Sequence, residues 1–323
     1  MIDLTQPRRG TVLVVGAGFL GSHIARRLLQ DGHHVRTLSR SIPQAVHSRL
    51  LDGVEVLIGD ATDPAAVGAA MAGVEWVVFG AGGLFPAASQ SDPIPDLGLA
   101  LRPLLTMLDA VARVPGTAFT YLSSGGTVYG RSAPAAARIR EDHPTDPITA
   151  YGVLKLAGEK FTGIYSGQSG MPIRVLRCAN VYGDGQRSDR GQGAVGAFLS
   201  ALRRGEPVTI FGDGRVVRDF VHVNDVAAAV ALLRPAASPV NRGNEIVNVG
   251  TGVGVNLSEL LALTEELLSV KARVTRLPAR PFDVERNVLD ITRLVTLSGL
   301  TPMSLREGLE LTLASGMASR AVS

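Results

Sequence analysis

The chain has 323 residues, enough for one large domain or two modest ones, and 46% of them are hydrophobic. Its net charge is +3 and its arginines are scattered, so no nucleic-acid-binding or membrane-binding patch is expected. The single cysteine, Cys178, excludes an internal disulfide and a multi-cysteine metal site and suits a reducing cytosol. No run of about 18 apolar residues suggests a membrane span, so we expect a cytoplasmic protein. The sequence shows no cluster of metal-binding side chains, so we also expect no metal ion.

Short β-branched runs alternate with helical patterns through the first half of the chain. Strands are predicted over residues 11–15, 34–38, 54–58, 76–79, 118–123 and 173–178. Alternating strands and helices indicate a parallel sheet with helices on both faces. Such sheets bind ligands at the carboxyl ends of their strands, where we expect a long loop over residues 82–96.

The second half of the chain is less regular. Strands are predicted near 208–214, 220–223 and 244–250, and helices near 257–269 and 304–315. We therefore predict an α/β fold with a Rossmann-type doubly wound parallel sheet and a smaller mixed α/β substrate lobe at the C-terminal end. The dinucleotide-binding domain is expected to be 1–180, with 221–255 returning to it, and the substrate lobe 181–220 and 256–323.

The first turn, VVGAGFLGSH, places Gly16, Gly18 and Gly21 between an apolar strand and a helix. Glycine permits the tight turn, the close approach of backbone to a pyrophosphate and the packing of helix on strand. The N-terminus of the helix favours the phosphate charge. These features predict a dinucleotide site, and the alternative is a glycine turn with a purely structural purpose.

The end of the second predicted strand bears on the choice of dinucleotide. A carboxylate there would hold both ribose hydroxyls of NAD, but this chain has Ser39 and Arg40, which can bind a 2′-phosphate. This favours NADP over NAD, although Arg40 can also be solvated or stack on adenine. Asp60, after the third strand, is suited to accept a hydrogen bond from the adenine amino group or, alternatively, to cap a loop or helix.

Tyr151 and Lys155 lie four residues apart at the start of a predicted helix, so both side chains project from one face. An ammonium and an oxidised nicotinamide beside the phenol would lower its pKa, and the phenol could then exchange a proton with a substrate alcohol or carbonyl during hydride transfer. The chain has only three lysines, and a compact ammonium fits between a phenol and ribose hydroxyls better than a planar guanidinium. The alternative is an exposed ion-pairing position.

Four further segments follow the glycine turn in order: YLSSGGTVYG (121–130), AYGVLK (150–155), RCANVYG (177–183) and VVRDFVHVNDVA (216–227). Together they resemble the extended short-chain dehydrogenase/reductase family over nearly the whole chain. That family includes UDP-galactose 4-epimerase, sugar-nucleotide 4,6-dehydratases and deoxysugar 4-ketoreductases. The resemblance implies an NAD(P)-dependent enzyme that acts on a nucleoside diphosphate sugar, and a homodimer packed through the helices around 98–114 and 150–166.

The resemblance also implies roles for single residues. Tyr151 would be the catalytic acid/base, and Lys155 would bind the nicotinamide ribose and lower the pKa of Tyr151. The residues expected to bind the substrate diphosphate and nucleobase are Asn180, Thr209, Phe211, Arg218 and Arg280. The residues expected to contact the cofactor are Gly16, Gly18, Phe19, Leu20, Gly21, Ser39, Arg40, Asp60, Ala61, Ala81, Gly82, Tyr151 and Lys155.

Two positions depart from the family pattern. The family has a serine or threonine two residues before the threonine of TVYG, where this chain has Gly125. Ser124 and Thr127 flank that glycine, and we expect Thr127 to supply the hydroxyl because the glycine pair lets the chain bring it inward. The asparagine that belongs to a proton path in the family has no counterpart over residues 96–111.

Three functions follow from these residues. The favoured one is the NADP-linked reduction of the 4-keto group of a nucleoside-diphosphate 4-keto-6-deoxyhexose, because Arg40 favours the cofactor of net reductants. The alternative is an NAD-dependent sugar-nucleotide 4-epimerase, which removes hydride from C4 and returns it to the other face. A non-catalytic NADP-binding sensor is a third alternative, and it would not need Tyr151 and Lys155.

Overall fold

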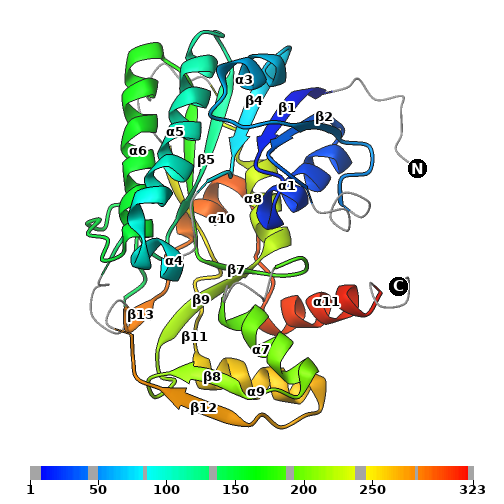
Figure 1. The fold of residues 1–323 in the computed structure, drawn as a ribbon, viewed down its shortest axis with the longest axis vertical. Coiled ribbons are helices and arrows are strands. Elements are labelled where there is room, and N and C mark those ends of the chain that lie inside the picture. The colour runs from blue at the N-terminus through cyan, green and yellow to red at the C-terminus, as the bar shows by residue number, and fades with distance from the viewer. Residues whose placement is uncertain are drawn as a thin grey trace.

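The main sheet of the protein contains seven strands. The computed structural model describes residues 9–42, 50–82, 86–130, 137–186, 193–236, 245–280 and 283–318. The strands of the main sheet are β1 (Arg9–Val15), β2 (His33–Ser39), β3 (Glu55–Ile58), β4 (Val74–Phe79), β5 (Ala118–Ser124), β6 (Ile173–Cys178) and β10 (Glu245–Val249). They are all parallel and lie in the order β10-β6-β5-β4-β1-β2-β3 (Figure 1).

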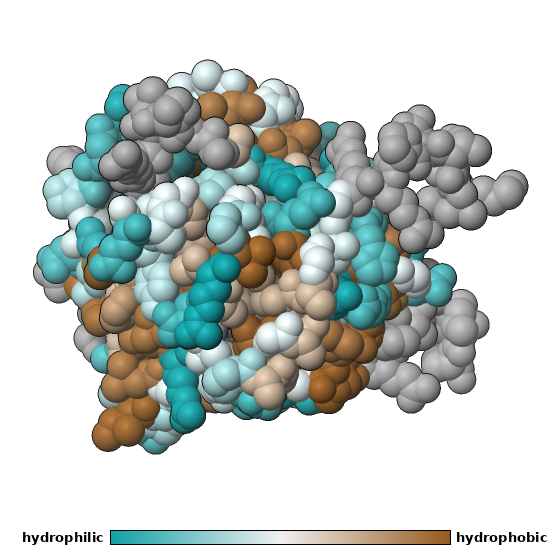
Figure 2. Space-filling model, turned by 90° about the horizontal axis from the view of Figure 1, so that it is seen from above, coloured by the Kyte–Doolittle hydropathy of each residue, from teal (hydrophilic) through white to brown (hydrophobic). Residues whose placement is uncertain are grey.

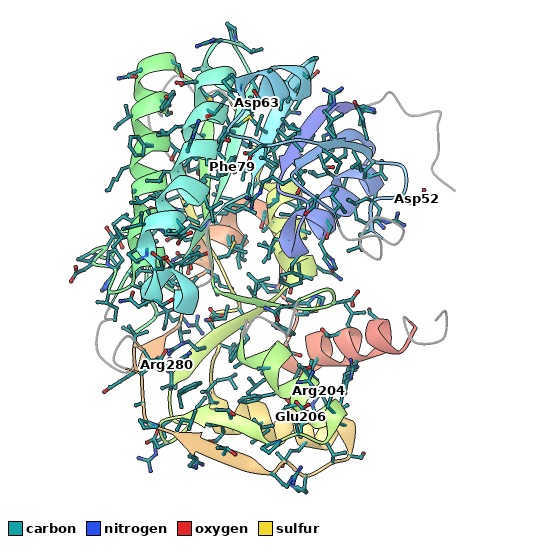
Figure 3. All side chains as sticks on the ribbon, in the orientation of Figure 1. Asp52, Asp63, Phe79, Arg204, Glu206 and Arg280 are labelled. Atoms are coloured by element: carbon teal, nitrogen blue, oxygen red, sulfur yellow. The ribbon has the colours of Figure 1, made fainter. Side chains whose placement is uncertain are left out.

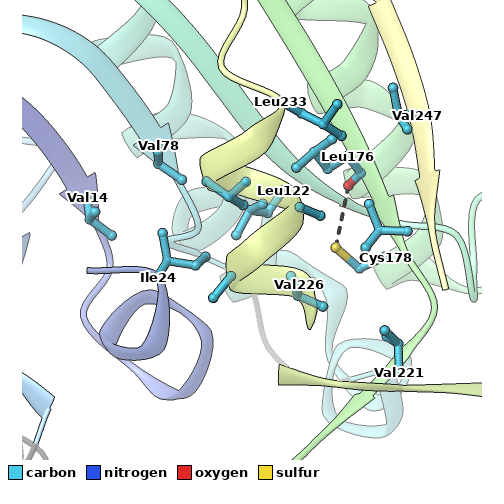
Figure 4. Packing of buried hydrophobic residues seen from close by; sticks show 14 of the residues in the cluster. Val14, Ile24, Val78, Leu122, Leu176, Cys178, Val221, Val226, Leu233 and Val247 are labelled. Carbon is cyan, nitrogen blue, oxygen red and sulfur yellow. Dashed lines mark hydrogen bonds between the residues drawn. The ribbon is translucent and has the colours of Figure 1, made fainter. Parts of the chain in front are cut away.

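Helices cover both faces of this sheet (Figure 1). One face carries α1 (Phe19–Gln30), α8 (Val223–Leu232) and α10 (Thr292–Ser298), and the other carries α3 (Pro64–Ala70), α5 (Pro93–Ala112) and α6 (Ala150–Ser169). Alternate strand residues supply the two cores, because successive side chains of a strand point to opposite faces. Val14 packs with Ile24 and Val226 in one cluster (Figure 4), and Leu13 packs in the other. The predicted doubly wound fold is confirmed.

The prediction of a loop over residues 82–96 is wrong for the part of this segment that the structure describes. This segment contains α4 (Pro86–Ser91) and the start of α5. Both helices begin with a proline, whose missing N–H costs nothing in the first turn and whose fixed φ angle suits a helix. The prolines that read as loop residues are therefore helix starts.

The rest of the described chain forms a smaller group of strands and helices. The strands are β7 (Asn180–Tyr182), β8 (Val208–Phe211), β9 (Val217–His222), β11 (Gly254–Asn256), β12 (Val274–Leu277) and β13 (Arg286–Asn287), and the helices are α7 (Ala194–Arg204), α9 (Leu257–Leu268) and α11 (Leu305–Ala318). Strand β9 pairs with β7, β11 and β13, while β8 pairs with β12. A third core cluster lies here, and the mixed lobe of the predicted fold is confirmed.

The segment expected to return to the main domain contributes α8 and β10, and β10 pairs with β6 in the main sheet. Strand β9 begins and ends earlier than predicted, because Val223 already belongs to α8. In Figure 3, Phe79 lies in the main sheet, whereas Arg204, Glu206 and Arg280 lie in the smaller part. The exact domain borders stay a prediction.

The outer surface mixes polar and apolar residues, as the face in Figure 2 shows. Within the described ranges, no helix combines the length and apolar character needed to cross a membrane. The same ranges contain no group of three or more histidine, cysteine, aspartate or glutamate side chains placed to hold a metal ion. The cytoplasmic location stays a prediction.

Candidate active site

The glycine turn lies where the strand order of the main sheet reverses, because β1 is flanked by β2 on one side and β4 on the other. Such a reversal opens a crevice at the carboxyl ends of the strands. Gly16 has a φ of 94°, and a Cβ there would lie 2.8 Å from the backbone of Ala81. A Cβ at Gly21 would lie 1.8 Å from the carbonyl oxygen of Gly16, so helix and turn touch.

Gly18 has a different role, because no described atom lies within 4 Å of a Cβ built there. It is the N-cap residue of α1 and has no side chain to cap the helix. Among the described residues, the space beside Gly18 at the start of α1 is therefore open, as a phosphate site requires. Phe19 and Leu20 follow in the first turn of α1, partly buried.

The residues expected around the adenosine lie at the ends of β2 and β3. The Ser39 hydroxyl donates to the carbonyl of Ser41 at 3.2 Å, and Arg40 is exposed. Asp60 accepts a hydrogen bond from the backbone N–H of Thr62 at 2.8 Å, which lowers the pKa of its carboxyl, and the charge of Arg40 adds a smaller effect. Asp60 thus caps a turn, while its contact with adenine stays a prediction, and its neighbour Ala61 is buried.

Tyr151 and Lys155 come together in a small cavity at the carboxyl edge of the sheet. Ala81 and Gly82, which follow β4, line the same cavity. The Lys155 ammonium donates to the carbonyl of Leu122 at 3.0 Å and lies 5.7 Å from the centre of the Tyr151 ring. The structure therefore brings together four of the residues predicted to meet the cofactor.

Local interactions place this pair. Thr149 caps α6 by accepting a hydrogen bond from the N–H of Gly152 at 3.1 Å, so Tyr151 falls in the first turn. A Cβ at Gly152 would lie 2.8 Å from the carbonyl of Thr127, which means that α6 packs directly on the TVYG segment. Across the cavity, Gly82 has a φ of 97°, and its Cβ would lie 2.5 Å from the carbonyl of Leu99. Pro103 inside α5 cannot donate to that carbonyl, which leaves it facing the turn.

Burial dominates the acid–base properties of the cavity. Burial raises the pKa of Tyr151 above its ordinary value, and Cys178 and Asp96 raise it further. Burial lowers the pKa of Lys155 to about 8, against the opposing effects of Cys178, Asp96 and Glu159. In the protein without cofactor, Tyr151 is therefore a protonated phenol at neutral pH, while Lys155 is mostly charged. The predicted acidic shift of Tyr151 would have to come from the positive charge of a bound nicotinamide.

Gly125 is explained by its surroundings. A Cβ there would lie 2.7 Å from Leu289 and 2.9 Å from the carbonyl oxygen of Arg177, so a serine at this position has no room. Thr127, the residue expected to replace the missing hydroxyl, directs its own hydroxyl to the carbonyl of Ser124 at 3.5 Å. Ser124 ends β5, is partly exposed, and has no hydrogen-bond partner for its hydroxyl among the described residues.

The two predicted diphosphate arginines lie close together. Arg218 on β9 and Arg280 both face the carboxylate of Asp283, at 3.5 Å and 3.0 Å. Burial lowers the pKa of Arg218 to about 10, and Arg280 contributes to this as a neighbouring positive charge. Arg218 therefore stays charged at neutral pH, and the carboxylate of Asp283 opposes the effect of burial on it.

The remaining predicted substrate residues extend from this pair in two directions. The Arg280 guanidinium lies 4.5 Å from the centre of the Phe211 ring, and Thr209 is exposed on the same strand, β8. Asn180 donates to the backbone carbonyl of Asp219, next to Arg218, at 3.1 Å. The Asn180 side chain and the Ser124 hydroxyl are also the atoms nearest to a Cβ built at Gly126, at 3.8 Å and 3.9 Å. Asn180 thus connects the end of β5 with the arginine pair.

Three residues near the site were not predicted. Asp96 and Tyr121 line the cavity of Tyr151 and Lys155, and Asp283 joins the two arginines. Asp283 carried a usable signal, since it follows Arg280 closely in an otherwise apolar and basic stretch. Asp96 carried none, because an acid in the first turn of a helix is normally a solvated residue.

The reversed sheet, the open helix N-terminus after β1 and the tyrosine–lysine cavity define the class of dinucleotide-dependent α/β enzymes. Residues 12–250 match the family described as "NAD dependent epimerase/dehydratase family". The chain belongs to that family, which is NAD-dependent, and it is an enzyme. The sensor alternative is set aside.

Known relatives agree with this family. The chain is 33% identical to a UDP-glucose 4-epimerase of Mycolicibacterium smegmatis, over 93% of this chain and 96% of the relative. It is 30% identical to a dTDP-4-dehydro-6-deoxy-D-allose reductase of a Streptomyces species, over 93% and 94% of the two chains. It also resembles the solved structure of UDP-glucose 4-epimerase with UDP-glucose from Thermotoga maritima, with a TM-score of 0.88, 30% identity and coverage of 96% and 99%.

Proposed function

We propose that this enzyme exchanges hydride at C4 of a nucleoside diphosphate sugar, acting as an NAD-dependent 4-epimerase. The observation that carries the proposal is the run of contacts from β5, where the Leu122 carbonyl accepts a hydrogen bond from Lys155, to the arginine pair. Ser124 and Asn180 both border Gly126, and Asn180 in turn binds the backbone beside Arg218. The end of β5 thereby connects the place proposed for the sugar, near Tyr151, with the place proposed for the diphosphate, at the arginines.

Tyr151 would exchange a proton with the C4 hydroxyl of the sugar. Bound NAD supplies the hydride acceptor and a positive charge. Lys155, whose pKa is about 8, would hold the nicotinamide ribose as an ammonium at neutral pH. Because burial raises the pKa of Tyr151, the phenol stays protonated at neutral pH and has a proton to give to a C4 alkoxide, and it becomes a base only beside added positive charge.

The substrate class follows from the charges at the second end of the surface. Two guanidinium groups bind phosphate oxygens in pairs, so Arg218 and Arg280 suit a diphosphate. Asp283 balances them before the substrate binds. Phe211 offers an aromatic face beside Arg280 for the nucleobase. UDP-glucose is bound by the similar T. maritima enzyme, and we infer a nucleotide sugar of this kind for the present one.

Ser124 is the better candidate for the hydroxyl that contacts the sugar. Its hydroxyl has no partner among the described side chains and backbone groups, while that of Thr127 is directed at a carbonyl. The matched variants Ser124→Ala and Thr127→Val distinguish the two. We expect the serine variant to lose at least about tenfold in kcat and the threonine variant to keep most of it. The reverse order would assign the role to Thr127.

A 4-ketoreductase is the second candidate, and Ser39 and Arg40 favour it. Both lie at the end of β2, where no carboxylate would repel the 2′-phosphate of NADP. The similarity to the Streptomyces reductase is compatible with this function. Two observations favour the 4-epimerase over the 4-ketoreductase. The family is described as NAD-dependent, and the similar M. smegmatis and T. maritima proteins are both 4-epimerases.

One experiment separates the two functions. The purified enzyme is assayed for retained dinucleotide, then for interconversion of UDP-glucose and UDP-galactose, and then with NADPH and a 4-keto sugar nucleotide. Interconversion with retained NAD and no net loss of NADPH supports the epimerase. Stoichiometric oxidation of NADPH identifies the ketoreductase, and no reaction in either assay contradicts the proposal.

We also infer a homodimer packed through α5 and α6. Both helices expose large apolar side chains, with Ile94 76%, Leu97 50%, Val153 51% and Ile164 52% accessible. Such a patch on a single chain marks an interaction surface. Analytical ultracentrifugation should give twice the chain mass, and Ile164→Asp should reduce it. A wild-type monomer at micromolar concentration would rule out this dimer.

A further inference from the structure

Asp96 inverts the usual pattern of an amphipathic helix. It lies in the first turn of α5 with no exposed surface, while Ile94, two residues earlier, is 76% accessible and Leu97, the next residue, is 50% accessible. Burying a carboxylate is costly, and exposing two apolar side chains in the same turn gains nothing for the monomer. The orientation of α5 therefore brings this acid inward, toward the side of the helix that faces the main domain.

The cavity that Asp96 lines is the cavity of Tyr151 and Lys155. It has about 10 Å³ of free space, the room of about one water molecule, so the side chains that line it enclose a small space. Ala100, one turn after Asp96 on the same face of α5, also lines it and leaves this space open. Asp96 lies on α5, the helix that covers the region in which the family's asparagine was expected and not found.

The charged and titratable groups around this cavity come from four packed elements. They are Asp96 on α5, Tyr121 on β5, and Tyr151, Lys155 and Glu159 on α6, with Cys178 at the end of β6. Burial raises the pKa of Cys178 to about 12, so its thiol is neutral. Glu159 already accepts hydrogen bonds from Arg177 and Ser123. Of the two acids, Asp96 is the one that lines the cavity together with Lys155.

We propose that Asp96 is a positioning residue whose carboxylate keeps Lys155 charged and sets the pH range in which Tyr151 exchanges its proton. The first part concerns the folded protein alone, and the second rests on the proposed function. The direction of both effects follows from the charge: a neighbouring carboxylate raises the pKa of Lys155 and that of Tyr151.

The first test measures Lys155 directly and needs no turnover. The chain has three lysines, Lys155, Lys160 and Lys271, so ¹³C-labelled lysine gives three side-chain signals, of which Lys155→Arg identifies one. In Asp96→Asn the Lys155 titration midpoint should fall by roughly one pH unit. Asp92→Asn is the matched control, because Asp92 is an exposed acid one turn earlier, and it should leave the midpoint unchanged. An unchanged midpoint in Asp96→Asn overturns the proposal.

The second test follows the pH dependence of C4 exchange. Removing the carboxylate lowers the pKa of Tyr151, so the pH profile of kcat should move to lower pH in Asp96→Asn. At high pH the affinity for NAD should fall, because Lys155 loses its charge earlier. Asp96→Glu should restore both. A loss of kcat with an unmoved profile would mean that Asp96 is only structural. If Asp96→Asn does not fold, Asp96→Ser removes the same charge in a smaller side chain. A wild-type enzyme inactive on sugar nucleotides would sink the proposed function and leave the lysine titration standing.

Discussion

The buried ion pair behind the active site gives a sharp stability prediction. Glu159 on α6 and Arg177 on β6 are each 3% accessible. The Arg177 Nε and Nη2 atoms donate to the two carboxylate oxygens at 3.0 Å and 2.7 Å, and the Ser123 hydroxyl donates to Glu159 as well. Glu159 lies one turn after Lys155, so this pair fixes the catalytic helix on the sheet.

Glu159→Gln keeps the shape of the side chain but removes the charge and turns an N–H donor toward Arg177. Leaving one partner of a buried pair uncompensated costs about 3 kcal/mol or more. For a chain of this size we expect the melting temperature to fall by roughly 4 °C or more. Because α6 then loses its anchor, kcat should fall as well.

The assay is thermal unfolding by calorimetry, together with urea unfolding, for Glu159→Gln and a matched control. The control is Glu206→Gln, because Glu206 pairs with Arg204 at 2.7 Å but each partner is 53% exposed (Figure 3). We expect the control to melt with the wild type, since exposed pairs contribute little. Equal stability of the two variants would refute the reasoning from burial.

Three further predictions follow from single contacts. Gly21→Ala places a Cβ 1.8 Å from the Gly16 carbonyl, so it should lower the stability by about 1–3 kcal/mol and also lower the affinity for NAD. Gly18→Ala has open space around its Cβ, so it should keep the stability and lose only affinity in calorimetric titrations with NAD. Arg280→Ala should weaken UDP binding about 10-fold to 100-fold. Arg276 is exposed, so Arg276→Ala serves as the control and should change the Kd for UDP little. Equal Kd values for the two variants would argue against the diphosphate site. His222 caps α8, and burial lowers its pKa from 6.5 to about 4. The stability that neutral His222 contributes is therefore present above pH 6.5, and about 3 kcal/mol of it is lost as the pH falls toward 4. His222→Asn keeps a capping oxygen and should flatten that part of the unfolding profile; an identical pH dependence would contradict the lowered pKa.

The fold could be read from the sequence because its strands and turn signals are local. The six predicted strands of the first half correspond to β1–β6 within two residues at each end. The segment around α4 could not be read in this way, because Pro86 and Pro93 are loop residues in most contexts and helix starts only when a packed helix follows.

The site was predictable where spacing decides geometry and unpredictable where packing does. Tyr151 and Lys155 share a cavity because an interval of four places them on one helix face. The choice between Ser124 and Thr127 depends on where the folded chain directs the Thr127 hydroxyl, and the glycine at 125 depends on Leu289, which comes from a distant part of the chain. The inward orientation of Asp96 depends on how α5 packs against α6 and β5, which the local pattern does not contain.

The role of Tyr151 as the proton carrier at C4 is tested most directly by Tyr151→Phe. The variant should retain bound NAD and the wild-type Kd for UDP, because neither depends on the phenolic hydroxyl, while interconversion of UDP-glucose and UDP-galactose falls by about 10²-fold to 10⁴-fold. Wild-type turnover in Tyr151→Phe would contradict the acid–base chemistry on which the proposed function depends.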